Sequence, residues 1–96
     1  MSENKNIDLI HRIKRMRYRC WHRGTQEMDL ILGNFADVHL PQYNIEQLDK
    51  FEKLMGEQDT DLLSWILGQN PIPDNIDAEL IAELKDFQLK RSESDE

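Results

Sequence analysis

Few residues in this sequence have the types and spacing that enzyme chemistry requires. The three histidines (His11, His22 and His39) do not form an HExxH pair, and no glycine-rich loop leads into a lysine and a hydroxyl residue to hold phosphate. Cys20, the single cysteine, can form neither an internal disulfide nor a thiolate metal site, and a small buried hydrophobe is its simplest interpretation. We therefore expect no catalytic site, no metal site and no stably bound cofactor.

A pentapeptide near the N-terminus, Arg23-Gly24-Thr25-Gln26-Glu27, is better suited to contact another molecule. Glycine permits backbone angles and close approaches that other residues do not, and it leaves the start of the following helix without a covering side chain. Arg23 and Glu27 then place opposite charges on either side of bare main chain, where they can pair with each other or with a partner. The alternative is a capped helix turn, in which Glu27 stabilises the helix N-terminus and Arg23 is solvated.

The charges are distributed unevenly along the chain. Residues 1–24 carry seven lysine and arginine side chains against two acidic ones, a formal charge of +5, whereas residues 25–96 carry five basic and seventeen acidic ones, giving −12 and a total of −7. A basic segment on an acidic body suits nucleic acid, an anionic membrane surface, an acidic patch of another protein, or pairing within the chain itself. Tyr18 and Trp21 among the cations would suit nucleic-acid bases, so a small nucleic-acid-binding regulator is one alternative, although the acidic body would repel a polyanion.

Two helices are predicted to carry these features, because apolar residues recur there at three- and four-residue steps. The first is expected from about residue 8 to residue 20, with Asn6 or Asp8 as its cap. After a break at residues 22–25, a second helix would run to just before Pro41. The apolar residues of this second helix are Met28, Ile31, Leu32 and Phe35, and Glu27 and Asp29 would lie in its first turn.

The remainder of the chain predicts three more helices. A capping box from Asn44 to Gln47 would open the third helix, which Gly56 would end. A short fourth helix would begin near Asp59 and end at Gly68. The apolar residues of these two helices are Leu48, Phe51, Leu54 and Met55, followed by Leu62, Leu63, Trp65, Ile66 and Leu67.

The last helix is expected after a loop that contains two prolines within residues 71–73. Asp74 or Asn75 would cap it, and its apolar stripe would run through Phe87. We therefore predict an all-α five-helix bundle, with residues 1–90 forming a single domain and residues 91–96 a disordered acidic tail. No segment is apolar enough for a membrane span or a signal peptide, so no membrane insertion is expected.

The segment from Tyr18 to Asp29, YRCWHRGTQEMD, resembles the RGxxE signature of the SdhE-type succinate dehydrogenase assembly factors. The resemblance continues in the family's order and spacing over roughly residues 9–73. Its further blocks are Leu32, Phe35 and Ala36, then residues 51–55, then residues 59–68. The short motif alone would occur by chance, but the three blocks together are specific to the family.

The resemblance implies a chaperone-like assembly factor that binds the flavoprotein subunit of succinate dehydrogenase and promotes covalent attachment of FAD (flavinylation). Some members also act on the fumarate reductase flavoprotein. Because the acidic body would repel a polyanion, we expect no nucleic-acid partner. FAD would belong to the partner protein. A helical adaptor that uses the same surface for another protein remains an alternative. Because no transit segment precedes the motif, we expect a bacterial cytoplasm rather than the mitochondrial matrix.

The partner-binding residues that the resemblance implies are mostly in the motif. Those expected from it are Arg23, Gly24, Glu27, Asp29, Tyr18, Arg19 and Asp61. Trp65 also matches a family-typical position but is equally suited to the core. Thr25 and Gln26 differ from the hydrophobic and basic residues of many members, which leaves the detailed partner preference open.

Overall fold

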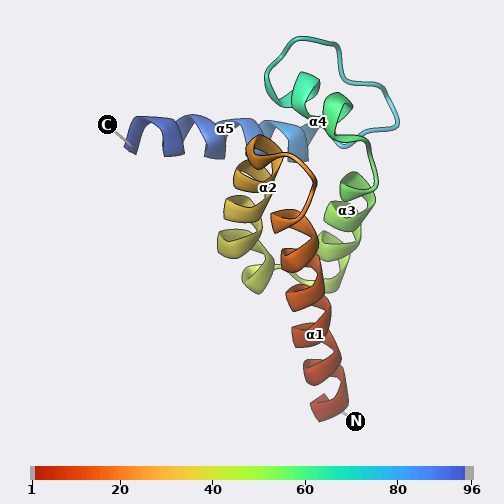
Figure 1. Cartoon of the computed structure of the whole chain (residues 1–96). Helices are drawn as coiled ribbons and strands as arrows, with labels where there is room; N and C mark the ends of the chain where they lie inside the picture. The colour runs from red at the N-terminus through yellow and green to blue at the C-terminus, as the bar shows by residue number, and fades with distance from the viewer. Residues whose placement is uncertain (1, 95–96) are drawn as a thin grey trace. The chain divides into compact units, whose positions relative to one another are not determined.

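The computed structural model describes residues 2–94 of the chain, and the side chains of residues 7–91. Within residues 2–94 it contains five α-helices, one short 3-10 helix and no strand (Figure 1). The predicted all-α class with five helices is therefore confirmed for this part of the chain. Contacts between residues group the chain into two compact units, residues 1–43 and residues 44–96. That residues 1–90 form a single domain remains a prediction.

The first unit contains α1 (Ser2–Trp21), α2 (Gln26–His39) and the 3-10 helix η1 (Leu40–Gln42). α1 packs against α2, and η1 contacts both helices. The buried apolar residues of the first unit are Met16, Cys20, Met28, Ile31, Leu32, Phe35, Ala36 and Leu40. The predicted α2 stripe is therefore buried, and Cys20 is buried as its simplest interpretation required.

The two ends of α1 differ in how well the sequence predicted them. The helix begins at Ser2, so Asn6 and Asp8 lie within it and the prediction that either residue caps it is wrong. No glycine or proline interrupts residues 2–8, so the helix extends towards the N-terminus beyond the start predicted near residue 8. The predicted break at residues 22–25 is confirmed, and α2 ends at His39, two residues before Pro41.

The second unit contains α3 (Ile45–Met55), α4 (Asp59–Ile66) and α5 (Ala78–Ser94). The predicted capping box of α3 is confirmed: the Gln47 amide donates to Asn44 Oδ1 at 2.8 Å, and the Asn44 amide donates to Gln47 Oε1 at 2.9 Å. Gly56 is the C-cap of α3, as expected. The buried apolar residues of this unit are Leu48, Phe51, Leu54, Met55, Leu62, Trp65, Ile66, Leu80, Ile81 and Leu84.

The last helix, α5, begins later and ends later than predicted. Its first turn is capped by Asp77, whose Oδ1 accepts a hydrogen bond from the Leu80 amide at 3.1 Å. Asp74 and Asn75 are not caps, because they lie in a turn closed by a hydrogen bond from the Ile76 amide to the carbonyl of residue 73 at 3.1 Å. α5 continues beyond residue 87 to residue 94, within the segment 91–96 that was expected to be a disordered tail. Residues 95 and 96 lie outside the described residues.

Candidate partner-binding site

The connection between α1 and α2 presents main chain that no side chain covers. Gly24 has a φ of 117°, a backbone conformation that residues with a Cβ rarely adopt. A Cβ built on Gly24 would have no heavy atom within 4 Å beyond its chain neighbours. Glycine is therefore required here by the backbone conformation and not by internal packing, and the outer face of the loop is open to another molecule.

Two hydrogen bonds to the first turn of α2 fix the conformation of this loop. Thr25 is the N-cap of α2, and its Oγ1 accepts a hydrogen bond from the Met28 amide at 3.3 Å. Asp29 Oδ1 accepts a hydrogen bond from the Arg23 backbone amide at 2.6 Å. Asp29 thus has an internal role that the sequence analysis missed, while its expected role as a partner contact remains a prediction.

The two charged residues of the motif lie on either side of the open glycine. Glu27 is exposed in the first turn of α2, where a carboxylate also stabilises the helix N-terminus. Arg23 is half-buried and precedes Gly24. The helix turn is therefore capped, as the alternative required, but Arg23 is half-buried and not fully solvated. The exposed carboxylate of Glu27 is accessible to a partner.

The last turns of α1 place an aromatic pair directly before the loop. The Tyr18 and His22 rings are stacked, with centroids 4.0 Å apart and planes at 18°. His22 Nδ1 lies 2.8 Å from the Tyr18 carbonyl oxygen. Because a carbonyl oxygen only accepts hydrogen bonds, Nδ1 must carry the hydrogen. The Tyr18 side chain is 64% exposed and Arg19 is also exposed, so both predicted residues are accessible beside the loop.

Cys20 lies on the opposite, buried side of α1 and is unsuited to nucleophilic chemistry. Burial raises the pKa of its thiol to about 12, although the positive charges of Arg23 and Arg19 lower it and the negative charge of Asp37 raises it further. The thiol is therefore neutral at physiological pH, whereas a nucleophilic cysteine reacts as the thiolate. A mechanism based on Cys20 finds no support in this environment.

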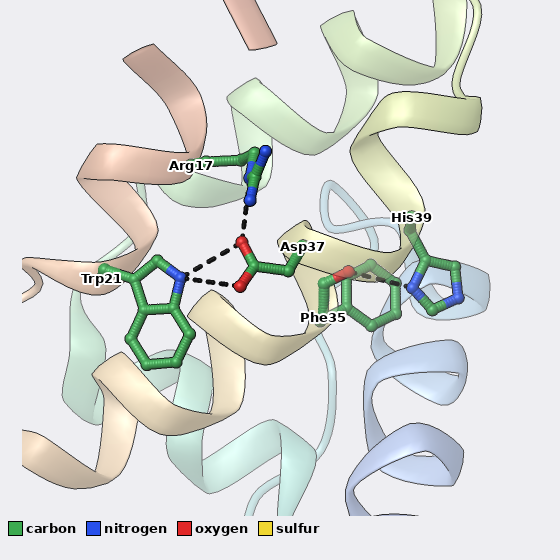
Figure 2. A network of polar contacts seen from close by, with 5 residues as sticks. All are labelled: Arg17, Trp21, Phe35, Asp37 and His39. Atoms are coloured by element: carbon green, nitrogen blue, oxygen red, sulfur yellow. Dashed lines mark hydrogen bonds and ion pairs between the residues drawn. The ribbon is translucent and has the colours of Figure 1, made fainter. Parts of the chain in front are cut away.

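A partly buried polar contact between α1 and α2 was not predicted from the sequence (Figure 2). Trp21 Nε1 donates to both carboxylate oxygens of Asp37 at 3.2 Å, and Arg17 Nε donates to Asp37 Oδ1 at 2.9 Å. The Trp21 indole lies against Gly33, because a Cβ built on Gly33 would overlap the ring atoms. The available signal was Gly33 itself, since a glycine inside a helix costs about 1 kcal/mol relative to alanine and usually has a packing reason.

The third histidine is accounted for by local structure. His39 stacks on Phe35 with ring centroids 3.9 Å apart, and its Nδ1 donates to the Phe35 carbonyl oxygen at 3.0 Å (Figure 2). Among the described residues, no group of three or more histidine, cysteine, aspartate or glutamate side chains is arranged to hold a metal ion. None of the helices in the described residues has the length and apolar character to cross a bilayer.

One predicted site residue lies outside the first unit. Asp61 is exposed on α4, and its backbone carbonyl accepts a hydrogen bond from Ser64 Oγ at 2.8 Å. Trp65 on the same helix is only 8% exposed and belongs to the core of the second unit. The structure therefore groups Tyr18, Arg19, Arg23, Gly24, Glu27 and Asp29 at the α1–α2 connection.

Comparison with known proteins gives one family match that covers this connection. Residues 14–88 match the family model described as "Flavinator of succinate dehydrogenase". The match includes the last turns of α1, the Gly24 loop and all of α2. No solved structure matches the chain.

Curated relatives come from both mitochondria and bacteria. The chain is 35% identical over 96 aligned residues to the mitochondrial succinate dehydrogenase assembly factor 2 of Schizosaccharomyces japonicus, covering 91% of this chain and 67% of the relative. It is 31% identical over 67 residues to the FAD assembly factor SdhE of Acetobacter pasteurianus, covering 70% and 62%. A mitochondrial succinate dehydrogenase assembly factor 2 of Aspergillus flavus is 39% identical over 62 residues, or 65% of this chain and 21% of that protein. The matches thus cover between 21% and 67% of the length of these relatives.

Proposed function

Because this chain belongs to the family of succinate dehydrogenase flavinators, we propose that it binds the flavoprotein subunit of that enzyme and promotes its covalent attachment of FAD. The main support for this proposal is the family match over residues 14–88, which includes the open Gly24 loop. Family membership confirms the resemblance that the RGxxE motif predicted. It also supports the prediction that the chain is an assembly factor and not an enzyme.

The exposed loop is the part of the chain that we assign to the partner. Gly24 lets a folded protein approach the main chain, and Glu27 offers a carboxylate for charge-assisted hydrogen bonds. Arg23 supplies a positive charge on the other side of the glycine. The loop is fixed by α2 before any partner arrives, so binding requires little further ordering of its backbone.

The contribution of this protein to flavinylation is then one of orientation. The one cysteine is buried and neutral, so we assign it no part in forming the covalent bond to the flavin. A bound factor can accelerate such a step by holding the flavoprotein in a conformation that brings its reacting side chain and its flavin together. FAD remains a ligand of the flavoprotein in this mechanism.

The test is coexpression of the flavoprotein subunit with variants of this chain, with covalent flavin read as in-gel fluorescence. Gly24→Arg would place a long side chain on the approach path, and we expect it to reduce covalent flavin about tenfold or more, as for an interface hot spot. Glu27→Ala removes one charged contact and should give a smaller decrease. Undiminished labelling with both variants would contradict the proposed role of the loop.

A matched control separates loss of contact from loss of helix stability. Glu79 is exposed in the first turn of α5, as Glu27 is in the first turn of α2. Glu79→Ala should therefore cost similar helix-dipole stabilisation and leave covalent flavin at the wild-type level. The fumarate reductase flavoprotein in the same assay tests the wider partner range that the resemblance implies.

A further inference from the structure

Two open hollows on the first unit share two of their lining residues. The first, the aromatic hollow, has a volume of about 400 Å³ and is lined by Lys14, Arg17, Tyr18, Trp21, His22 and Asp37. The second, the aliphatic hollow, has a volume of about 380 Å³ and is lined by Ile10, Ile13, Lys14, Arg17 and Pro41. Since Lys14 and Arg17 line both hollows, they form a basic ridge between them.

Internal contacts fix the walls of the aromatic hollow. Trp21 and Arg17 both donate to the Asp37 carboxylate, as Figure 2 shows, and the Tyr18 ring stacks on His22. These contacts engage the one carboxylate of the hollow from within the chain. With Lys14 and Arg17 against Asp37, the lining carries a net positive charge. The hollow thus combines rigid aromatic walls with a cationic edge.

The aliphatic hollow exposes apolar surface on the other side of the basic ridge. Ile10 is 62% exposed, Pro41 is exposed and Ile13 is half-buried. Covering such surface with an apolar side chain of a partner would remove it from water and favour binding. This hollow is therefore suited to an aliphatic or aromatic side chain.

Charge and shape together select one class of ligand for the two hollows. Between residues 7 and 21, α1 carries five basic side chains and one acidic side chain, which favours an anionic partner. Nucleic acid would satisfy the cations but offers no aliphatic group for the surface of Ile10 and Pro41. A helix that lies on a bilayer presents a continuous apolar face, whereas here the basic ridge of Lys14 and Arg17 separates the two hollows. An acidic polypeptide with apolar side chains meets both requirements.

On the basis of the proposed function, we propose that the two hollows and the basic ridge dock an acidic segment of the flavoprotein, with a carboxylate on the ridge and one apolar side chain in each hollow. Ile10 and Tyr18 are eight residues apart on α1, about 12 Å along the helix axis at about 1.5 Å for each residue. An extended segment covers this length in about four residues. The docked segment should therefore carry its two apolar residues about four positions apart, with aspartate or glutamate between them.

Matched pairs of variants test this docking surface, with affinity for the FAD-free flavoprotein measured by calorimetry. Lys14 and Arg15 are neighbouring exposed cations, but only Lys14 lines the hollows. Lys14→Glu should weaken binding about tenfold or more, and Arg15→Glu by less than about threefold. Likewise Ile10→Asn should weaken binding about tenfold, whereas Ile7→Asn, at a residue that is 51% exposed but lines neither hollow, should leave it nearly unchanged.

The outcomes distinguish this inference from the function on which it rests. If the wild-type chain does not bind the flavoprotein, the proposed function fails. If it binds but the two charge reversals have equal effects, the basic helix steers association without a docking surface and the inference is overturned. The inference is also overturned if Lys14→Glu and Ile10→Asn abolish sedimentation with vesicles of phosphatidylserine and phosphatidylcholine, or dissociate a dimer of this chain, while flavoprotein binding stays unchanged.

Crosslinking identifies the docked segment directly. With p-benzoylphenylalanine in place of Ile10, irradiation of the complex should yield one flavoprotein peptide that contains a carboxylate between two apolar residues. The same group in place of Ile7 should give little of this product. A crosslinked peptide without acidic residues would overturn the assignment of the ligand class.

Discussion

Gly24 and Gly33 lie in the same unit and are required for opposite physical reasons. Gly24 has a positive φ and open space around it, whereas Gly33 lies within α2 beneath the Trp21 indole. A side chain at Gly24 would strain the backbone and project outward, while one at Gly33 would collide with a ring of the same chain. One glycine thus leaves a surface open and the other allows two helices to approach closely.

The inner side of the α1–α2 pair serves packing, whereas its outer side is exposed and accessible to a partner. On the inner side, Cys20 is fully buried and Gly33 is buried beneath the Trp21 indole. On the outer side, Tyr18 and Glu27 are left to solvent beside the loop. Substitutions on the inner side should therefore act through stability, and substitutions on the outer side through partner binding.

The largest expected effect concerns the reactivity of Cys20. Because burial raises the pKa of its thiol to about 12, its alkylation by iodoacetamide at pH 8 should be about fiftyfold or more slower than that of an ordinary cysteine, since the scarcity of thiolate outweighs its higher nucleophilicity. The rate should still rise about tenfold for each pH unit between pH 9 and pH 10 if the thiol reacts within the folded state. Alkylation of the urea-unfolded chain serves as the reference. Equal rates in the folded and unfolded states would show that the Cys20 thiol is accessible to solvent and reagent.

The same pKa shift makes stability depend on pH. The buried neutral thiol favours the folded state fully below pH 9.0, and this contribution is lost as the pH rises towards about 12, because only the unfolded chain releases the proton there. The free energy of unfolding of the wild-type chain should therefore fall relative to that of Cys20→Ala above pH 9.

The second effect concerns the packing of Gly33. Gly33→Ala should lower the free energy of unfolding by about 1–3 kcal/mol, because the added methyl group would overlap the Trp21 indole. Urea unfolding monitored by tryptophan fluorescence measures the change. Asn34→Ala, at the next position of α2, is the control and should be within about 0.5 kcal/mol of wild type. An increase in stability of about 1 kcal/mol for Gly33→Ala, the gain from helix propensity alone, would refute the close contact.

The smallest expected effect on stability concerns Gly24. Gly24→Ala and Gly68→Ala each introduce a Cβ at a positive φ, 117° and 74° respectively, and each should lower the free energy of unfolding by about 1–2 kcal/mol. Their effects on covalent flavin should differ: Gly24→Ala should decrease it and Gly68→Ala should not. Equal flavin yields from the two variants would contradict a specific role of the Gly24 loop in flavinylation.

The helices of this chain were largely predictable because they rest on local patterns. The apolar stripes of α2, α3 and α4 and the Asn44–Gln47 capping box use contacts within a few residues, which spacing alone reveals. The cap of α5 was not predictable in the same way, because Asp74, Asn75 and Asp77 are all suitable residues. The turn after Pro73 decides among them, and only the structure shows it.

The candidate site was predicted in part for the same reason. An exposed turn at Gly24 follows from the intolerance of other residues for its backbone conformation. The interactions of Asp37 with Arg17 and Trp21 join residues that are 20 and 16 positions apart, and no sequence periodicity predicts such contacts. The aromatic hollow, which these three residues line, could therefore not be predicted from the sequence.

The hydrogen bond from the Arg23 amide to Asp29 has a consequence for measurements on the isolated protein. An amide in an exposed connection usually exchanges its hydrogen with solvent within a short time, but this amide is held at 2.6 Å by a half-buried carboxylate. Its exchange should be governed by opening of the first turn of α2. Hydrogen exchange at this single amide therefore measures how often the Gly24 loop leaves its partner-binding conformation in the isolated protein.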